Sequence, residues 1–143
     1  MRKAKIFLDT NVILDLLGER FPFYSSIAQI ATLADLGKMT IVASALSYAT
    51  VNYILSKYES PKVARGKLRN FKIISEISEL NEHIIEKGLN SKFTDFEDAL
   101  QYFSAIESEC EIIISRNGKD FKESQIPVMT AEEFLKSLKE RTI

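Results

Sequence analysis

Five short apolar runs recur along the chain, and segments of helical length separate them. The runs are residues 6–8, 39–42, 71–74, 111–115 and 126–129. Because these runs are apolar instead of alternating, they predict strands that are buried on both faces of a sheet. Strands that alternate with helices favour parallel pairing and right-handed crossovers. The sequence therefore predicts a doubly wound α/β fold around a mostly parallel sheet of about five strands.

Several residues predict where the intervening helices begin and end. Ser60 followed by Pro61 is typical of a helix start, and Gly37 is typical of a helix stop. The patterns Thr94-x-x-Glu97 and Thr130-x-x-Glu133 are capping boxes, in which two side chains satisfy each other's backbone amides. The expected helices cover residues 23–36, 60–69, 81–88 and 94–107, with a last one from residue 130. A further helix is expected to begin at Ser44 or Ser47 and to end near Lys57.

The composition excludes several classes of function. At 143 residues the chain has the length of a single domain, which we expect to cover residues 1–143. The 19 basic and 20 acidic residues leave a net charge of −1, which excludes a polycation that coats nucleic acid. One cysteine excludes an internal disulfide, and the single histidine argues against a site built on several imidazoles and against a conventional Ser-His-Asp triad. With no targeting or membrane-spanning segment, we expect the chain to reside in the reducing cytoplasm. Any metal chemistry would have to use carboxylate ligands.

Acidic residues fall where a parallel sheet would gather them at one edge. Asp9 ends the first predicted strand, and Asn117 and Asp120 follow the strand at 111–115. Asp95 and Asp98 open a helix that leads into that strand, so they start from the same edge. Ligands of open parallel sheets bind beyond the carboxyl ends of the strands.

The helix at 94–107 offers a second argument. At about 100° per residue, Asp95 and Asp98 fall within its apolar arc, whereas Glu97, Gln101 and Ser104 share the opposite side. A buried, unpaired charge costs several kcal/mol, so we expect either a cation or strong hydrogen-bond donors there. Carboxylates without histidine or thiolate partners suit Mg²⁺ or Mn²⁺. The alternative is that acids in a first turn merely complement the helix dipole, which explains Asp95 better than Asp98.

Four segments in this order resemble the PIN domain family, which includes the VapC-type toxins of bacterial toxin–antitoxin pairs. They are residues 6–12, 95–99, 114–121 and 126–130, and the likeness extends over nearly the whole chain. The resemblance implies a three-layer α/β/α sandwich and an endoribonuclease that depends on Mg²⁺ or Mn²⁺. It implies that three acids bind the metal, namely Asp9, Asp98 and Asp120. It also implies supporting polar roles for Ser115 and Asn117, and supporting or capping roles for Thr10 and Asn11.

One position departs from the family pattern. The family usually carries a glutamate in the helix after the second strand, and Thr50 occupies that place here. A threonine can hydrogen-bond a metal-bound water but adds no negative charge. We therefore expect either weaker metal binding or a substitute ligand in Asp95, and the catalytic competence of the site becomes a question.

Basic residues concentrate between positions 57 and 72, where six of them accompany one acid, Glu59. Lys57, Lys62 and Arg65, together with Arg116, are candidates for RNA binding beside an acidic site that would itself repel RNA. The alternative is an ordinary solvated helix face. Tyrosines at 48, 53 and 58 are explained better by core packing than by base stacking. The aromatic run at 21–24 is either a packing element or an anchor for an antitoxin or a second subunit.

Three functional hypotheses follow. The first is a metal-dependent ribonuclease that serves as the toxin of a toxin–antitoxin pair. The second is a catalytically weakened PIN domain that binds RNA or a protein. The third is a phosphatase with Asp9 as nucleophile, which needs Lys119 or Arg116 to stabilise the transferred phosphoryl group.

Overall fold

The computed structural model describes residues 3–141 and contains one five-stranded sheet. Its strands are β1 (Ala4–Leu8), β2 (Met39–Ser44), β3 (Ser75–Ser78), β4 (Ile112–Ile114) and β5 (Val128–Met129). They lie in the order β3-β2-β1-β4-β5, and all four pairings are parallel. The predicted α/β fold is therefore confirmed, with β1 at the centre of the sheet.

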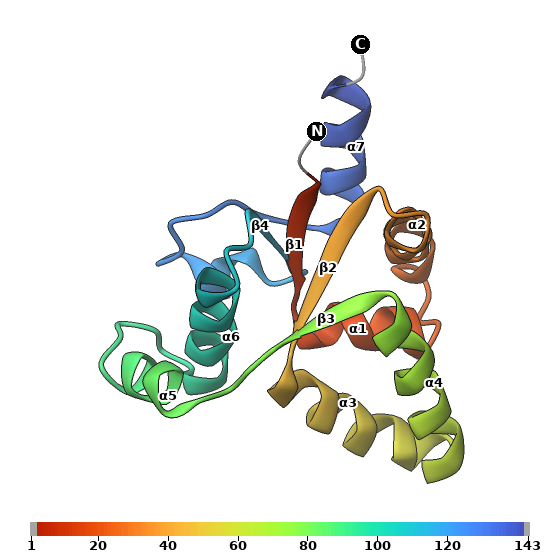
Figure 1. Ribbon diagram of the computed structural model, residues 1–143, viewed down its shortest axis with the longest axis horizontal. Coiled ribbons are helices and arrows are strands. Elements are labelled where there is room, and N and C mark those ends of the chain that lie inside the picture. Colours follow the sequence, from red (N-terminus) through yellow and green to blue (C-terminus); the bar gives the residue numbers. More distant parts are fainter. Residues whose placement is uncertain (1–2, 142–143) are drawn as a thin grey trace.

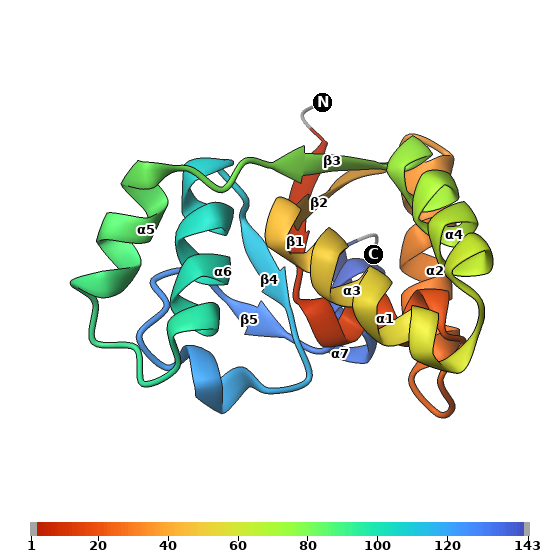
Figure 2. The same cartoon turned by 90° about the horizontal axis from the view of Figure 1, so that it is seen from below.

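Helices cover both faces of the sheet (Figures 1 and 2). They are α1 (Thr10–Leu17), α2 (Tyr24–Asp35), α3 (Ala45–Tyr58), α4 (Pro61–Ile73), α5 (Glu82–Leu89), α6 (Phe96–Glu107), the short 3₁₀ helix η1 (Gly118–Phe121) and α7 (Ala131–Arg141). The helices α5 and α6 lie on one side, and α1, α2, α4 and α7 lie on the other. Within residues 3–141, no helix is long and apolar enough to cross a lipid bilayer.

Strand β1 supplies both halves of the core. Ile6 and Leu8 are fully buried against the larger apolar cluster, which includes residues of α1 to α4 and α7. Phe7 points to the opposite face and is fully buried in the second cluster, with Tyr102 of α6 and Phe121 of η1. This alternation is why an uninterrupted apolar run is needed at the centre of a sheet with helices on both sides.

The third predicted strand is wrong in position. Residues 71–73 form the last turn of α4, and β3 begins at Ser75. Phe71 is buried against the core from the helix, whereas Ile73 is 78% exposed. Because β3 is an edge strand, it needs few apolar side chains, and its sequence Ser-Glu-Ile-Ser gives a weak strand signal.

The predicted helix ends are confirmed at three of four positions. The Oγ of Ser60 accepts a hydrogen bond from the amide of Val63, and Gly37 adopts a positive φ of 75° after α2. At Thr130 the capping box forms in both directions with Glu133. The exception is α6, where the cap is Asp95 and not Thr94.

Candidate active site

Asp9 is held at the carboxyl ends of the two central strands. Leu8 pairs with Ile114 across β1 and β4, so Asp9 and Ser115 leave the sheet side by side. The Ser115 hydroxyl donates to Oδ2 of Asp9 at 2.9 Å, and the amide of Thr10 donates to Oδ1 at 2.9 Å. Ser115 Oγ in turn accepts from the amide of Asn117 at 3.0 Å. With 6% of its surface exposed, Asp9 is fixed in orientation as the N-cap of α1.

The other predicted carboxylates act on Asp98 through their charge. Partial burial and the surrounding negative charges together raise the pKa of Asp98 to about 7. Burial is the largest cause, followed by the charges of Asp95, Asp9, Asp120 and Glu97 in that order. The structure therefore brings the acids of β1, α6 and η1 within electrostatic range of one another, as the topology predicts.

The pKa of the Asp9 carboxyl is also raised. Burial is the largest cause that raises the pKa of its carboxyl, and the charge of Asp120 adds to it. The hydrogen bonds from Ser115 and Thr10 lower this pKa, as does the more distant Arg116. Carboxylates that raise each other's pKa in a partly buried site are suited to a bound cation.

The acids do not form a finished coordination sphere. Over residues 3–141, no group of three or more aspartate, glutamate, histidine or cysteine side chains is arranged to hold a metal ion as it stands. Asp95 is exposed, and its Oδ1 accepts a hydrogen bond from the backbone amide of Asp98 at 3.0 Å. This hydrogen bond caps α6. The predicted burial of Asp95 in the apolar arc of α6 is therefore wrong, and its observed role is that of a cap.

A buried polar network lies beside the acids and joins three helices. The amide nitrogen of Gln101 donates to the hydroxyl oxygens of Thr10 and Ser47, both at 2.9 Å. These two hydroxyls are 2.8 Å apart and share a further hydrogen bond. Gln101 is 1% exposed and Ser47 is fully buried, so the network fixes α1, α3 and α6 relative to one another.

Sequence reasoning missed this network. Gln101 was expected on the polar side of α6, yet that side faces the end of the sheet, and Ser104 is fully buried there too. The oxygen of the Gln101 side chain and the Ser104 hydroxyl have no hydrogen-bond partner in the described part of the chain. The available signal was spacing, since Gln101 follows Asp98 by one helical turn and Thr10 adjoins Asp9.

Other predicted residues are spread around this edge. Thr50 is half-buried on α3, one turn after Ser47, and Asn11 is half-buried on α1 with its carbonyl accepting from Arg20 at 3.2 Å. Arg116 forms a bidentate pair with Asp15, at 2.7 and 3.2 Å. Its guanidinium also lies 4.0 Å from the centre of the Phe23 ring. Arg116 is thus already engaged within the chain.

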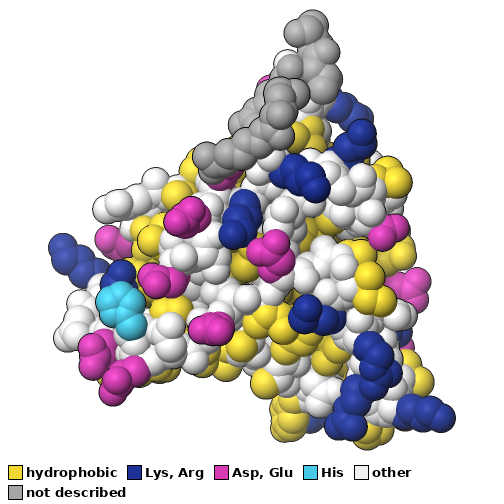
Figure 3. All heavy atoms as spheres, in the orientation of Figure 1, with side chains coloured by type: hydrophobic (Ala, Val, Ile, Leu, Met, Phe, Trp, Pro, Cys, Tyr) yellow, Lys and Arg dark blue, Asp and Glu magenta, His cyan; other side chains and the backbone are white. Residues whose placement is uncertain are grey.

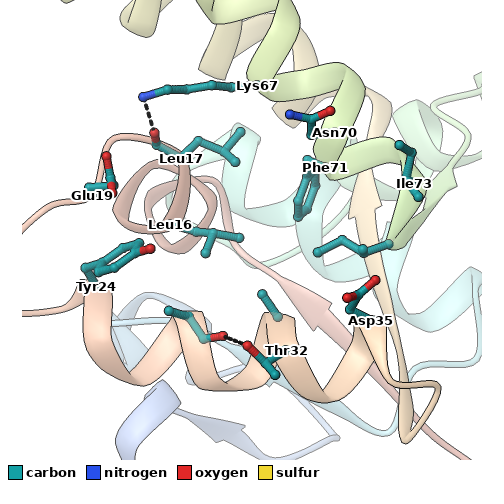
Figure 4. Close-up of a pocket in the computed structure, with 13 residues that line it drawn as sticks. Leu16, Leu17, Glu19, Tyr24, Thr32, Asp35, Lys67, Asn70, Phe71 and Ile73 are labelled. Atoms are coloured by element: carbon teal, nitrogen blue, oxygen red, sulfur yellow. Dashed lines mark hydrogen bonds between the residues drawn. The ribbon is translucent and has the colours of Figure 1, made fainter.

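A broad, open hollow lies away from the predicted site acids. It has a volume of about 590 Å³ between α1, α2 and α4, and its lining is mainly apolar (Figure 4). Leu16, Tyr24 and Phe71 line it, and none of the carboxylates that shift the pKa of Asp98 do. This hollow is therefore separate from the acidic edge.

Comparison with known proteins identifies the family of this chain. A family model described as the PIN domain matches residues 5–119. The chain belongs to the PIN domain family. Ribonuclease VapC1 of Aquifex aeolicus (strain VF5) is 33% identical over 139 residues, which cover 94% of this chain and 95% of that protein. This PIN domain is therefore homologous to a VapC ribonuclease over almost its full length.

Solved structures of VapC proteins share the fold of this PIN domain. VapBC2 from Rickettsia felis, bound to a DNA fragment from its promoter, gives a TM-score of 0.67 at 19% identity and covers 88% of this chain and 97% of that one. VapC20 from Mycobacterium tuberculosis, a toxin that cleaves the sarcin–ricin loop, gives 0.63 at 11% identity and covers 80% and 92%. At these identities the likeness supports the three-layer fold alone.

Proposed function

We propose that this PIN domain is a divalent-metal-dependent endoribonuclease. The observation that carries the proposal is the raised pKa of Asp98, because three elements of the fold direct negative charge onto one partly buried carboxyl. Such a site is stabilised by a cation, and oxygen donors favour Mg²⁺ or Mn²⁺. The homology to a VapC ribonuclease supports RNA as the substrate.

In this proposal Asp9, Asp98 and Asp120 are the metal-binding acids, with Asp95 as an additional ligand. When bound, the ion supplies a polarised phosphate and a water of lowered pKa. The chain itself holds the acids in place. The Ser115 hydroxyl fixes Asp9 and is ordered by the amide of Asn117.

The remaining polar residues take supporting roles. The amide of Thr10 donates to Asp9, and its hydroxyl ties α1 to α3 and α6 through the buried network. Asn11 has its carbonyl fixed by Arg20. Thr50 is proposed to hydrogen-bond a water beside the acids. The net reaction adds one water across a phosphodiester bond and releases a hydroxyl and a phosphate monoester.

The test uses purified protein and a structured RNA in the presence of Mn²⁺. We expect Asp9→Asn and Asp98→Asn each to lower the cleavage rate by about 100-fold or more, since each removes a charge that stabilises the transition state through the ion. Asp35→Asn, on the exposed end of α2, is the matched control and retains activity. Cleavage that survives both site substitutions belongs to a contaminant and refutes the proposal.

A second function is favoured by Thr50, which stands where the family usually carries a glutamate. With one acid fewer, the domain would bind RNA or a protein without efficient cleavage. Retained RNA binding and absent cleavage in the wild-type protein would select this function. The phosphatase hypothesis loses one of its two candidates, because Arg116 is held by Asp15, while Lys119 is exposed on η1.

The biological setting follows from the relatives. Solved relatives include VapBC complexes, so we propose an antitoxin protein as partner and a toxin–antitoxin pair as the context. The RNA substrate implies the cytoplasm. We also propose a single domain over residues 1–143, because Phe134 of α7 is fully buried in the same core as β1. A homodimer is a separate proposal. Size measurement by sedimentation and co-purification with the neighbouring gene product test these assignments.

A further inference from the structure

The outer face of α4 carries a line of unpaired basic side chains. Lys62, Arg65, Arg69 and Lys72 follow one another at helical spacing and are all exposed. The helix contains no acidic residue, and within residues 3–141 none of these four side chains forms an ion pair. We call these four residues the basic stripe. Lysine and arginine side chains gather at the lower right of Figure 3, over α4 as labelled in Figure 1.

On the inner face of the same helix, Lys67 has a structural role. Lys67 donates to Oε1 of Glu59 at 2.7 Å and to the carbonyl of Leu17 at 2.8 Å, so it ties α4 to α1. Figure 4 shows this side chain directed at Leu17 beside the apolar hollow. The fold thus uses one basic residue of α4 for its own contacts and leaves the basic stripe free.

The surface along the basic stripe is hollowed. One hollow of about 390 Å³ is lined by Pro61, Lys62, Arg65 and Arg69. A second, of about 420 Å³, is shallow and mainly apolar; it shares both arginines and adds Lys72, groups of α3, and the apolar side chains of Leu68 and Ile77. Guanidinium groups along adjoining shallow hollows are suited to a run of phosphates.

Gly66 lies within the basic stripe, between Lys62 and Arg69 along the helix. A glycine inside a helix destabilises it relative to alanine. Packing does not require this glycine, because a Cβ at position 66 would meet nothing within 4 Å. A missing side chain does allow a ligand to approach the helix backbone closely. Gly66 therefore leaves the helix backbone within the basic stripe open to the approach of a ligand.

Helix α3 connects this surface to the acidic edge. It begins after Ser44 at the carboxyl end of β2, and its far end leads into α4. Tyr53 and Tyr58 are 63% and 82% exposed, so the prediction that they pack in the core is wrong. Lys57 places Nζ 4.2 Å from the centre of the Tyr53 ring. An exposed ring that already contacts a cation is a usual platform for an unpaired base.

We infer that the outer face of α3 and α4 is a docking surface for single-stranded RNA, with phosphates on the basic stripe and a base on Tyr53. The identity of the ligand rests on the proposed ribonuclease function. The acidic edge repels RNA, so attraction must come from another surface, and this one has the complementary charge. Because α3 spans about 20 Å, a long strand can contact both regions whereas a dinucleotide cannot.

The first test measures binding of a fluorescently labelled single-stranded RNA of about 20 nucleotides by anisotropy, with Asp9→Asn in every protein to prevent cleavage. We expect Arg65→Gln with Arg69→Gln to weaken binding by about 10-fold or more and to reduce the salt slope by about 0.7 per arginine. Lys38→Gln with Lys136→Gln removes the same charge from exposed sites elsewhere and is the control. Equal losses in both pairs would show that only net charge matters and would overturn the inference.

The second test is Gly66→Ala, which separates a binding role from a structural one. Alanine favours the helix, so we expect the Tm to rise by about 2–4 °C while RNA affinity falls several-fold. A raised Tm with unchanged affinity would overturn the inference. A change in sedimentation coefficient without a change in RNA affinity would mean that a second copy of the chain occupies this face, and would also overturn it.

Failure of this inference and failure of the proposed function are distinguishable. If the Arg65→Gln/Arg69→Gln pair raises the KM for a long RNA but leaves dinucleotide cleavage unchanged, both stand. Binding that depends on the stripe without any cleavage supports the surface and refutes the nuclease. Cleavage of long RNA that is indifferent to the stripe supports the nuclease and refutes the surface.

Discussion

Two buried aspartates lie at α1, Asp9 as its N-cap and Asp15 within it, and their charges are compensated differently. Asp15 is 2% exposed and is met by two guanidiniums, from Arg20 at 2.9 Å and from Arg116 at 2.7 Å. Asp9 is 6% exposed and is met by a hydroxyl and an amide, while neighbouring charges include Asp120. The charge of Asp15 is thus compensated within the fold. The carboxylate of Asp9 is oriented by its hydrogen bonds but forms no ion pair within residues 3–141, although the charge of Arg116 lowers its pKa.

The largest effect we expect is on Asp15. Replacing it with asparagine leaves two guanidiniums without their carboxylate, and loss of one partner of a buried pair is strongly destabilising. Because both arginines are partly exposed, we expect the free energy of unfolding to fall by about 2–3 kcal/mol. Urea denaturation measures this. Asp9→Asn keeps a competent N-cap and should leave stability nearly unchanged, so equal losses would contradict the comparison.

The next prediction adds the acid that the family pattern expects. Thr50→Glu places a further carboxylate one turn beyond Ser47, and we expect Mn²⁺ to bind about tenfold more tightly because another oxygen ligand carries charge. Isothermal titration calorimetry measures the affinity. The matched control is Thr32→Glu on the exposed face of α2, which should not change it. An unchanged affinity at Thr50→Glu would place this residue outside the site.

The buried network gives a smaller effect. Gln101→Leu removes the amide that joins Thr10 to Ser47, although these two hydroxyls keep their own hydrogen bond. We expect a loss of about 1 kcal/mol in unfolding free energy. Gln29→Leu on the exposed face of α2 serves as control. If the two substitutions cost the same, the network does not hold the helices together.

The smallest predicted effect is the dependence of stability on pH. The pKa of Asp98 is about 7 in the folded protein and about 3.9 in an unfolded chain, so the folded state binds the extra proton. Its stabilising contribution is present below the unfolded pKa and is lost as pH rises through 7. Solvent screens this partly exposed carboxyl, so we expect the Tm in EDTA to fall by only about 1–2 °C between pH 5 and 8 on its account.

Asp98→Asn isolates this contribution. The variant should show a flatter change of Tm over the same pH range, because the titrating group is gone. Added Mn²⁺ should raise the Tm of the wild-type protein more at pH 8 than at pH 5. A variant with the slope of the wild type would assign the pH dependence to other groups.

Local signals in the sequence were sufficient for the frame of the fold. Apolar runs identify β1 and β4 because these strands are buried on both faces, and the box at Thr130 and Glu133 needs only residues of its own turn. The convergence of Asp9 and Asp98 follows from parallel topology alone. Strand β3 was misplaced because an edge strand exposes half its residues and carries little apolar signal.

The buried network could not be predicted because it depends on tertiary packing. A helical wheel sorts α6 by polarity, and it assigns Gln101 to solvent. In the fold, that side meets Thr10 and Ser47, residues 91 and 54 positions away in sequence, whose hydroxyls make burial of an amide acceptable. Similarly, nothing local shows that Arg116 pairs with Asp15 instead of with a ligand.

Two consecutive residues after β4 bind the two buried acids of α1. Ser115 donates to Asp9 at the N-cap, and Arg116 pairs with Asp15 in the second turn. These contacts hold the start of α1 rigidly against β4. Asp98 stands on the facing helix, where the first turn is secured by its own cap at Asp95. Because the Gln101 network also ties α6 to α1, we expect any adjustment that draws the proposed metal ligands together to occur in side-chain rotamers, such as that of the half-buried Asp98, and not in a shift of the helix.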